Sequence, residues 1–346
     1  MNAPNPSQAA ATDGPRDWKI FTGEGTPHNG LATLPPPPPW RFAHTLKPLV
    51  PPVADLRGSE AEGRRARPFI ASDPMRTAVN AALYLRRPLL LTGRPGTGKS
   101  TLIAKVAHEL RLGPVLRWPI NSRSTVRSGV YEYDAVGRLQ AGRKEPPVQQ
   151  YLKLGPLGTA LVAGDWPRAL LIDEIDKSDL DFANDLLNVI EEGEYEIPEL
   201  RRLGGKEQVE VDDFEGHTVS ITGGRLECRQ FPIVMMTSNA EREFPAPFLR
   251  RCVRLEIEPP KSTELLRIVE SHLKEHADVL DRAEIQALVD RFDSDQQENQ
   301  EVATDQLLNS VFLTVAMRNV QKRKFDAGEL SAVREQLMRP LSGQGM

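Results

Sequence analysis

Residues 93–100 read Gly93-Arg94-Pro95-Gly96-Thr97-Gly98-Lys99-Ser100, the G-x-x-x-x-G-K-S pattern of a phosphate-binding loop. An apolar run of strand length, Pro88–Thr92, comes directly before it, and a helical pattern, Thr101–Leu110, follows it. Glycines let successive backbone N–H groups turn toward phosphate oxygens, and the helix N-terminus adds a partial positive charge. We therefore expect a nucleotide's phosphates to be bound by Gly93, Arg94, Pro95, Gly96, Thr97, Gly98, Lys99, Ser100 and Thr101. Lys99 would reach the β- and γ-phosphates.

A second apolar run, Ala169-Leu-Leu-Ile, ends in the acidic pair Asp173-Glu174. An acidic pair in this position lies at the carboxyl edge of the sheet, where open α/β sheets bind ligands. We expect Asp173 and the Ser100 hydroxyl to ligate Mg²⁺, and Glu174 to polarise the attacking water. Acidic residues after a strand also cap the following helix, so the catalytic interpretation depends on the pairing with residues 93–100.

Two further segments contribute candidate catalytic side chains. The apolar run Phe231–Met236 leads into Asn239, an amide placed to orient the water or contact the γ-phosphate, with a turn-forming asparagine as the alternative. Arg250 and Arg251 come just before the run Val253–Ile257. An arginine inserted into the site of a neighbouring subunit stabilises transition-state charge. The alternative for these arginines is a local ion pair at the surface.

The order of the apolar runs predicts the fold class. Strand-length runs occur at Pro88–Thr92, Val115–Ile120, Ala169–Ile172, Phe231–Met236 and Val253–Ile257, and helical patterns lie between them. This alternation predicts an α/β domain with a mainly parallel sheet. After Pro259-Pro260 the helical patterns continue at 261–276, 284–292, 305–320 and 330–337. We expect a Pro-rich leader (1–66), a nucleotide-binding core (67–259), a small all-helical lid domain (260–340) and a tail (341–346).

The leader holds 12 of the 29 prolines within its first 52 residues. Each proline lacks an N–H and fixes φ, so the composition predicts a disordered segment. Four aromatic residues leave open that the leader docks on the body of the protein or on a partner; they are Trp18, Phe21, Trp40 and Phe42.

The composition of the chain indicates the cellular compartment in which it works. Cys228 and Cys252 match no metal-binding or disulfide spacing, which favours a reducing compartment. No export signal is present and no run approaches the roughly 18 apolar residues of a membrane span, so we expect a cytoplasmic protein without membrane contact.

The net charge of −4 hides two segments of opposite charge. Residues 111–153 hold eight bases and three acids, whereas residues 173–216 hold four bases and sixteen acids. Such segments are either ordinary solvated faces or surfaces that meet between subunits or attract a charged client.

Together, these motifs resemble the MoxR-like branch of the AAA+ ATPases over about Ala71–Arg323. The resemblance rests on Gly93–Ser100 (Walker A), Leu171–Ser178 (Walker B), Gly155–Leu157, Asn239 (sensor 1) and Leu249–Cys252 (the arginine finger). It implies a P-loop AAA+ core with a sheet of five parallel strands, a helical lid, and hydrolysis of ATP with Mg²⁺. It also implies a homo-oligomeric ring, usually a hexamer, and a von Willebrand factor A-type or other protein client. Members carry an inserted element between Walker B and sensor 1, for which the hairpin-like segment Gly193–Gln230 is the candidate.

Two positions depart from the family pattern. Asp305 stands where the family has its second-sensor arginine, which leaves Arg318 or a neighbouring subunit to supply that charge. Arg250-Arg251-Cys252 stands where many relatives have Asp-Arg-Phe, so both arginines are candidates for the finger.

The sequence thus predicts an Mg²⁺-dependent ATPase that works as a ring and remodels or activates a protein partner. One alternative is a nucleic-acid-stimulated motor, or a restriction-type GTPase, that would use the basic segment. A second is a non-hydrolysing, nucleotide-gated scaffold or sensor in a bacterial conflict or defence system, favoured by the departure at Asp305. No motif selects the base, so ATP rather than GTP rests on the resemblance alone.

Overall fold

A computed structural model describes residues 18–41, 48–52, 59–141, 147–162, 164–204, 207–272, 282–297, 304–319 and 333. The central sheet consists of β1 (Leu89–Thr92), β2 (Leu116–Pro119), β5 (Ala169–Asp173), β10 (Ile233–Ser238) and β11 (Val253–Glu256). The strand order is β11-β1-β10-β5-β2, and every pair is parallel. The predicted α/β fold is confirmed, and each of the five predicted apolar runs supplies one strand.

Alternation along the strands sends side chains to two hydrophobic clusters, one on each face of the sheet. Leu89 and Leu91 join the cluster that includes α2 (Asp73–Leu85) and α3 (Lys99–Glu109). Leu90 joins the cluster on the other face, which includes α6 (Pro156–Val162) and α7 (Leu180–Glu192). The central sheet is therefore covered on both faces, as a parallel sheet requires.

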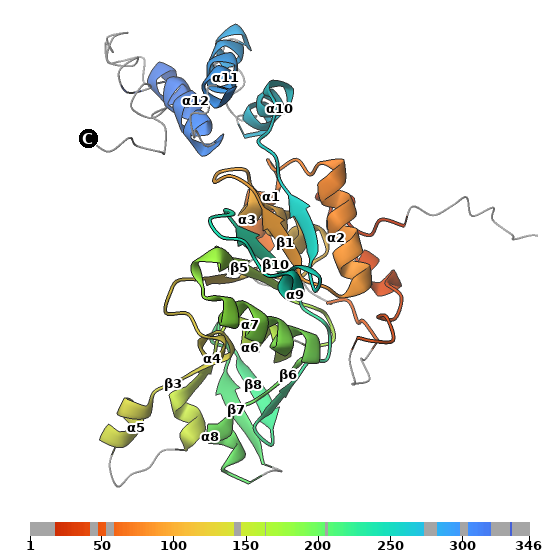
Figure 1. Cartoon of the computed structure of the whole chain (residues 1–346), viewed down its shortest axis with the longest axis vertical. Coiled ribbons are helices and arrows are strands. Elements are labelled where there is room, and N and C mark those ends of the chain that lie inside the picture. The colour runs from red at the N-terminus through yellow and green to blue at the C-terminus, as the bar shows by residue number, and fades with distance from the viewer. Residues whose placement is uncertain are drawn as a thin grey trace, which may run out of the picture.

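A second, six-stranded sheet lies at one end of the molecule (Figure 1). Its strands are β3 (Tyr131–Tyr133), β4 (Leu152–Leu154), β6 (Glu194–Glu196), β7 (Gln208–Asp212), β8 (Thr218–Thr222) and β9 (Arg225–Glu227). Their order is β3-β4-β7-β8-β9-β6. Short helices accompany them: α4 (Val126–Val130), α5 (Ala135–Gln140), α8 (Pro198–Arg201) and the 3₁₀ turn η2 (Val148–Tyr151). The hairpin pattern of Gly193–Gln230 forms β6–β9, and the pairing of β4 with β7 joins them to the earlier, basic segment.

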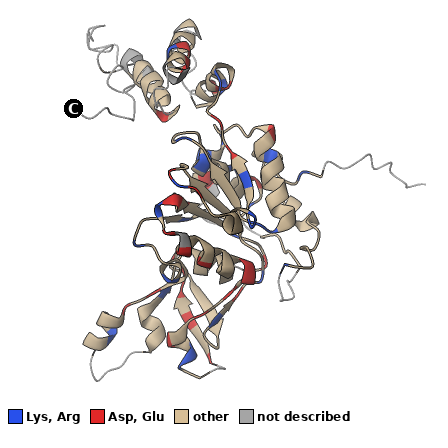
Figure 2. Cartoon of the chain, viewed as in Figure 1, with Lys and Arg blue, Asp and Glu red and all other residues tan. Residues whose placement is uncertain are grey.

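The basic and acidic segments contact each other within this chain. Arg127 Nη2 lies 2.7 Å from Glu199 Oε1, and the Tyr131 hydroxyl donates to Glu199 Oε2 at 2.7 Å. Burial and the hydrogen bond to Glu199 raise the pKa of Tyr131, so its phenol stays a donor. Figure 2 shows both red and blue stretches in the lower half of the chain. Part of the predicted opposite charge is thus paired inside one subunit.

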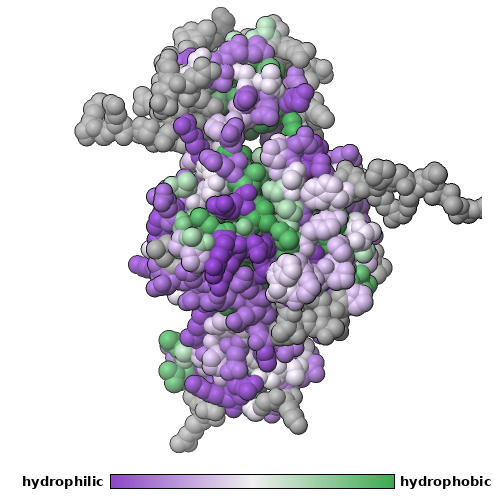
Figure 3. Space-filling model, turned by 45° about the vertical axis from the view of Figure 1, so that its right-hand side comes forward, coloured by the Kyte–Doolittle hydropathy of each residue, from purple (hydrophilic) through white to green (hydrophobic). Residues whose placement is uncertain are grey.

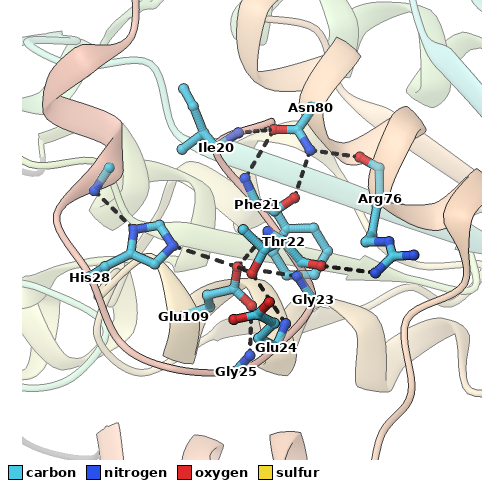
Figure 4. A network of polar contacts seen from close by, with 11 residues as sticks. Ile20, Phe21, Thr22, Gly23, Glu24, Gly25, His28, Arg76, Asn80 and Glu109 are labelled. Carbon is cyan, nitrogen blue, oxygen red and sulfur yellow. Dashed lines mark hydrogen bonds and ion pairs between the residues drawn. The ribbon is translucent and has the colours of Figure 1, made fainter. Parts of the chain in front are cut away.

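Residues 18–41 pack against the core, which corrects the expectation of a disordered leader for this part. Ile20, Phe21 and Leu31 are buried in the cluster of α2 and α3. The Asn80 side chain of α2 accepts from the backbone N–H of Ile20 at 2.7 Å and of Phe21 at 2.9 Å, and donates to the Phe21 carbonyl at 2.8 Å (Figure 4). Trp18 packs edge-on against Tyr84.

Glu109, the last residue of α3, holds the next turn of the leader. Its Oε1 accepts from the Thr22 N–H at 2.6 Å, the Thr22 hydroxyl at 3.0 Å and the Gly23 N–H at 3.2 Å, and its Oε2 accepts from the Gly25 N–H at 2.8 Å (Figure 4). This turn forms no strand or helix, and a side chain of the core satisfies its backbone donors instead. The leader continues through the 3₁₀ turn η1 (Gly30–Thr33), and α1 (Ser59–Ala66) packs against α3. Phe42 lies outside the described residues.

Three described helices follow the core: α10 (Ser262–His272), α11 (Arg282–Gln297) and α12 (Thr304–Asn319). They share a cluster of their own, formed by Leu265, Val269, Ile285, Val289, Phe292, Leu307 and Val311. Figure 1 shows them together at the end opposite the second sheet. The predicted helix over 330–337 lies outside the described residues except for residue 333, as does the predicted tail. Within the described part of the chain, no helix has the length and apolar character of a membrane span.

Candidate active site

The loop between β1 and α3 has positive φ angles at three glycines, Gly93, Gly96 and Gly98, a backbone that glycine adopts without strain. Gly98 has φ +83° and precedes α3 directly. Gly93 has φ +144°, and a Cβ atom there would lie 2.4 Å from the Ile257 carbonyl oxygen. The glycines therefore set both the turn and the distance between the loop and β11.

Lys99 is the first residue of α3 and points back into this loop. Its Nζ donates to the carbonyl oxygens of Gly93 at 2.7 Å and Arg94 at 2.8 Å. Burial lowers the pKa of Lys99, while the carboxylates of Asp176, Asp173 and Glu174 oppose that shift. A buried ammonium beside a glycine-rich loop is suited to binding phosphate oxygens.

Asp173 ends β5 and receives two hydroxyl groups on one oxygen. Ser100 Oγ donates to Asp173 Oδ1 at 2.9 Å, and Thr237 Oγ1 donates to the same oxygen at 2.5 Å. The Thr237 hydroxyl also accepts from the Glu174 N–H at 2.9 Å. Carboxylate and hydroxyl oxygens are the hard ligands that Mg²⁺ prefers, so Ser100 and Asp173 fit the predicted metal role.

Sequence reasoning assigned no role to Thr237. The register of the parallel strands is what places this residue in the site. Because Met236 pairs with Ile172, the next residue of β10, Thr237, lies level with Asp173. Thr237 therefore aligns the Asp173 carboxylate and fixes the start of the following turn.

Glu174 has a left-handed backbone, with φ +58°, which is uncommon for a residue other than glycine and marks a constrained position. It precedes the 3₁₀ turn η3 (Ile175–Lys177), and its Oε2 lies 2.6 Å from Lys177 Nζ. The hydrogen bond to Glu174 raises the pKa of Lys177. The predicted water-activating carboxylate is thus paired with a lysine that sequence reasoning did not single out.

Asn239 follows β10, and its backbone is held by Asp176. Asp176 Oδ2 accepts from the N–H of Asn239 at 3.0 Å and of Glu241 at 3.2 Å. The Asp176 carboxylate is buried, and its Oδ1 has no hydrogen-bond partner among the described residues. Asp176 therefore ties the turn after β5 to the turn after β10, a role that is invisible in a linear sequence.

A cleft of about 1240 Å³ brings most of the predicted residues together. From the core it is lined by Pro95, Gly96, Thr97, Gly98, Lys99, Ser100, Thr101, Asp173, Glu174, Thr237 and Asn239. The helices after the core, the predicted lid, contribute Glu264, Arg267, Ile268, His272, Thr304, Asp305 and Leu308. Hydrophobic surface is visible at the junction of core and lid in Figure 3. The lining combines charged side chains such as Lys99 and Asp173 with apolar ones such as Phe69 and Leu255, a mixture that suits a nucleotide's phosphates and base.

Arg250 and Arg251 lie outside the lining of this cleft. Both follow α9 (Ala246–Leu249). Arg251 is half-buried: its Nη1 donates to Asn188 Oδ1 at 3.0 Å, and its Nε lies 3.3 Å from Glu191 Oε2. Arg250 is exposed, and its guanidinium makes no hydrogen bond or ion pair with the described residues. The alternative of a local ion pair therefore describes Arg251.

The parallel sheet, the glycine-rich loop and the Asp173–Ser100 pair define a P-loop nucleotide-binding core. Residues 88–252 match the family described as the AAA domain of the dynein-related subfamily. This match supports an AAA+ P-loop ATPase, a class that uses a nucleotide and Mg²⁺, and it covers the chain from the start of β1 to the residue before β11. No curated protein matches the sequence.

Proposed function

We propose that this chain is an Mg²⁺-dependent ATPase of the MoxR-like branch of the AAA+ proteins. It works as a homo-oligomeric ring, a hexamer, that remodels or activates a protein client such as a von Willebrand factor A-type partner. The observation that carries the proposal is that Lys99, Ser100, Asp173 and Glu174 line one cleft between core and lid. The two cysteines are free and buried, which supports a cytoplasmic location.

Each side chain has a defined task in hydrolysis. The loop N–H groups and Lys99 bind the β- and γ-phosphates, and Ser100 and Asp173 would hold Mg²⁺, which neutralises charge developing on the phosphate oxygens. Glu174 orients and polarises the attacking water, for which its carboxylate must turn away from Lys177. Asn239 positions the same water, with its backbone fixed by Asp176.

Arg250 is the residue we assign to the neighbouring subunit's site. Its guanidinium is exposed and without a partner among the described residues, whereas Arg251 is engaged by Asn188 and Glu191 of its own chain. An exposed arginine can be inserted next to the γ-phosphate of another subunit without first breaking an ion pair.

The test compares Lys99→Ala and Glu174→Gln with the exposed control Lys153→Ala. Lys99→Ala is expected to abolish nucleotide binding, measured by titration with a fluorescent ATP analogue. Glu174→Gln is expected to bind ATP and release phosphate about 10²- to 10⁴-fold more slowly. Lys153→Ala should behave as wild type. Phosphate release by Glu174→Gln at the wild-type rate would contradict the assigned role, and full activity in a dilute monomer would rule out the arginine in trans.

A non-hydrolysing scaffold is the second candidate, because Asp305 lines the cleft where the resemblance calls for an arginine. ATP binding without phosphate release by the purified protein, with and without its client, would favour it. The nucleic-acid motor and the GTPase have less support, because several arginines of the basic segment are engaged within the chain, such as Arg127 by Glu199 and Arg117 by Glu62. Stimulation of turnover by DNA, lost steeply with salt, would revive the motor.

A further inference from the structure

Arg41 of the leader is buried against the end of α7. Its side chain is 5% exposed, and its Nη1 lies 3.3 Å from Glu191 Oε1. The Arg41 Nη2 atom has no hydrogen-bond partner among the described residues. A guanidinium in this setting depends on the single carboxylate that it faces.

Glu191 is shared between the leader and the segment after α9. Its other oxygen, Oε2, lies 3.3 Å from Arg251 Nε, and Arg251 Nη1 also reaches Asn188 on α7. Glu191 thus bridges Arg41 of the leader and Arg251 after α9. We call the cluster of Arg41, Glu191 and Arg251 the joint.

Arg250 projects from this joint. Arg87 Nη1 donates to the Arg250 carbonyl oxygen at 2.8 Å, so the backbone of residue 250 is fixed while its guanidinium stays exposed. Arg41 and Arg251 each lie 3.3 Å from the Glu191 carboxylate, and Arg87 binds the backbone of the residue before Arg251, so three guanidinium groups gather at the end of α7. With one carboxylate among several guanidinium groups, loss of Glu191 or of Arg41 would leave the remaining charges free to rearrange.

We propose that the leader is a positioning element for the trans-acting arginine: Arg41, through Glu191 and Arg251, orients Arg250 toward the neighbouring subunit's nucleotide. This inference rests on the proposed function, because it presumes that Arg250 acts in trans. Arg41 is not itself a catalytic residue; it acts through the joint.

The leader segment that precedes Arg41 is itself anchored in the core. Phe21 and Leu31 anchor the preceding residues in the core, and Glu109 binds the turn at residues 22–25. Because Glu109 is the last residue of the helix that begins with Lys99, the same segment contacts the phosphate-binding helix at one point and the arginine joint at another. The leader thus links a subunit's own site to the arginine that it offers to its neighbour.

Mixed oligomers provide the test. Arg41→Ala alone should hydrolyse ATP about ten- to a hundredfold more slowly, because small misplacement of a catalytic group costs that much, with its KM for ATP unchanged. Mixed with Glu174→Gln, whose own site is inactive but whose arginine is intact, Arg41→Ala subunits should recover activity. Mixed with Arg250→Ala they should not, since neither subunit offers a well-placed arginine. Trp40→Ala, 75% exposed beside Arg41, is the control and should match wild type.

A reference mixture separates this inference from the proposed function. If Arg250→Ala and Glu174→Gln do not complement each other, the trans mechanism itself is wrong. If that reference mixture is active but the mixture of Arg41→Ala with Glu174→Gln does not recover ATP hydrolysis, the positioning role of Arg41 is wrong. Wild-type turnover by Arg41→Ala alone would also overturn it. If Arg41→Ala does not assemble, Glu191→Gln replaces it, because this substitution removes the charge of the same joint from the core side. Glu191→Gln should recover activity with Glu174→Gln and not with Arg250→Ala, and failure to recover with Glu174→Gln would overturn the positioning role.

Discussion

The leader and the lid are attached to the same core in opposite ways. Residues 18–41 contain little regular structure, yet Phe21 and Leu31 belong to the hydrophobic cluster of the central sheet. The lid consists of regular helices, yet its buried residues form a cluster that shares no member with those of the core. Regular structure therefore does not indicate which segment is firmly joined to the core.

The difference has a consequence for function. A segment that shares its buried residues with the core unfolds with it, whereas a segment with its own cluster can change position as a unit. The lid lines the cleft and, under the proposed function, would move over a bound nucleotide, while the leader contacts both α3 and α7.

The largest effect is expected from Phe21→Ala. Phe21 is 0% exposed within the core cluster, and truncation of a buried phenylalanine costs about 3–5 kcal/mol. Chemical denaturation of the whole chain should show that loss in the main unfolding transition. Trp18→Ala, whose side chain is 47% exposed, is the control and should cost clearly less. Equal effects of the two substitutions would show that the leader is not part of the core.

Phe292→Ala is the matched substitution in the lid. Phe292 is also 0% exposed, but its neighbours belong to α10, α11 and α12. We expect a similar loss of about 3 kcal/mol confined to the lid, so hydrogen exchange should speed up in residues 262–272 and 304–319 while the amides of β1, β5 and β10 stay protected. A parallel loss of protection in the central sheet would show that lid and core unfold as one unit.

Glu109→Gln tests the polar attachment of the leader. The substitution keeps the shape but replaces one acceptor oxygen with a donor amide, which leaves at least one of the N–H groups of Thr22, Gly23 and Gly25 without a partner. An unsatisfied buried donor costs about 1–3 kcal/mol. Limited proteolysis should cut the leader faster, whereas the exposed control Glu24→Gln should not change the rate. Unchanged cleavage of Glu109→Gln would show that the apolar anchors alone hold the leader.

Much of the core could be predicted because its signals are local. Each strand is a short apolar run, and the loop at residues 93–100 has a spacing that only one geometry explains. The second sheet could not be predicted as a unit, because β4 and β7 come from segments that are far apart in the chain and pair through a single bridge, Lys153 with Asp212. The expectation of disorder was wrong for residues 18–41, whereas the alternative, docking on the body of the protein, holds for Trp18 and Phe21. Proline content reports the lack of a hydrogen-bond ladder and not the lack of anchors such as Asn80 and Glu109.

The residues of the candidate site also fall into those that local sequence predicts and those that only the tertiary structure reveals. Lys99, Ser100, Asp173 and Glu174 were predicted from motif and strand position, and the structure places them along one cleft. Thr237, Asp176 and Lys177 were missed because their roles depend on which strand ends lie beside each other. Arg251 contacts Glu191, which also contacts Arg41 at a separation of 150 residues in the chain, and no local pattern encodes that contact.

The smallest effect comes from the two thiols, one of which lies near the leader. Burial raises the pKa of both Cys228 and Cys252 to about 12, and the charge of Arg41 acts on Cys252 only. Below a pH of about 9, the ordinary thiol value, both thiols are protonated in the folded and unfolded chains, so their contribution to stability is fully present. As the pH rises toward 12, the unfolded chain releases protons that the folded chain keeps, and that contribution is lost. At pH 10 each thiol should lower the free energy of unfolding by about 1.4 kcal/mol relative to pH 8, a difference that Cys228→Ala or Cys252→Ala removes. A pH dependence of stability that neither substitution changes would show that burial does not keep these thiols protonated in the folded chain.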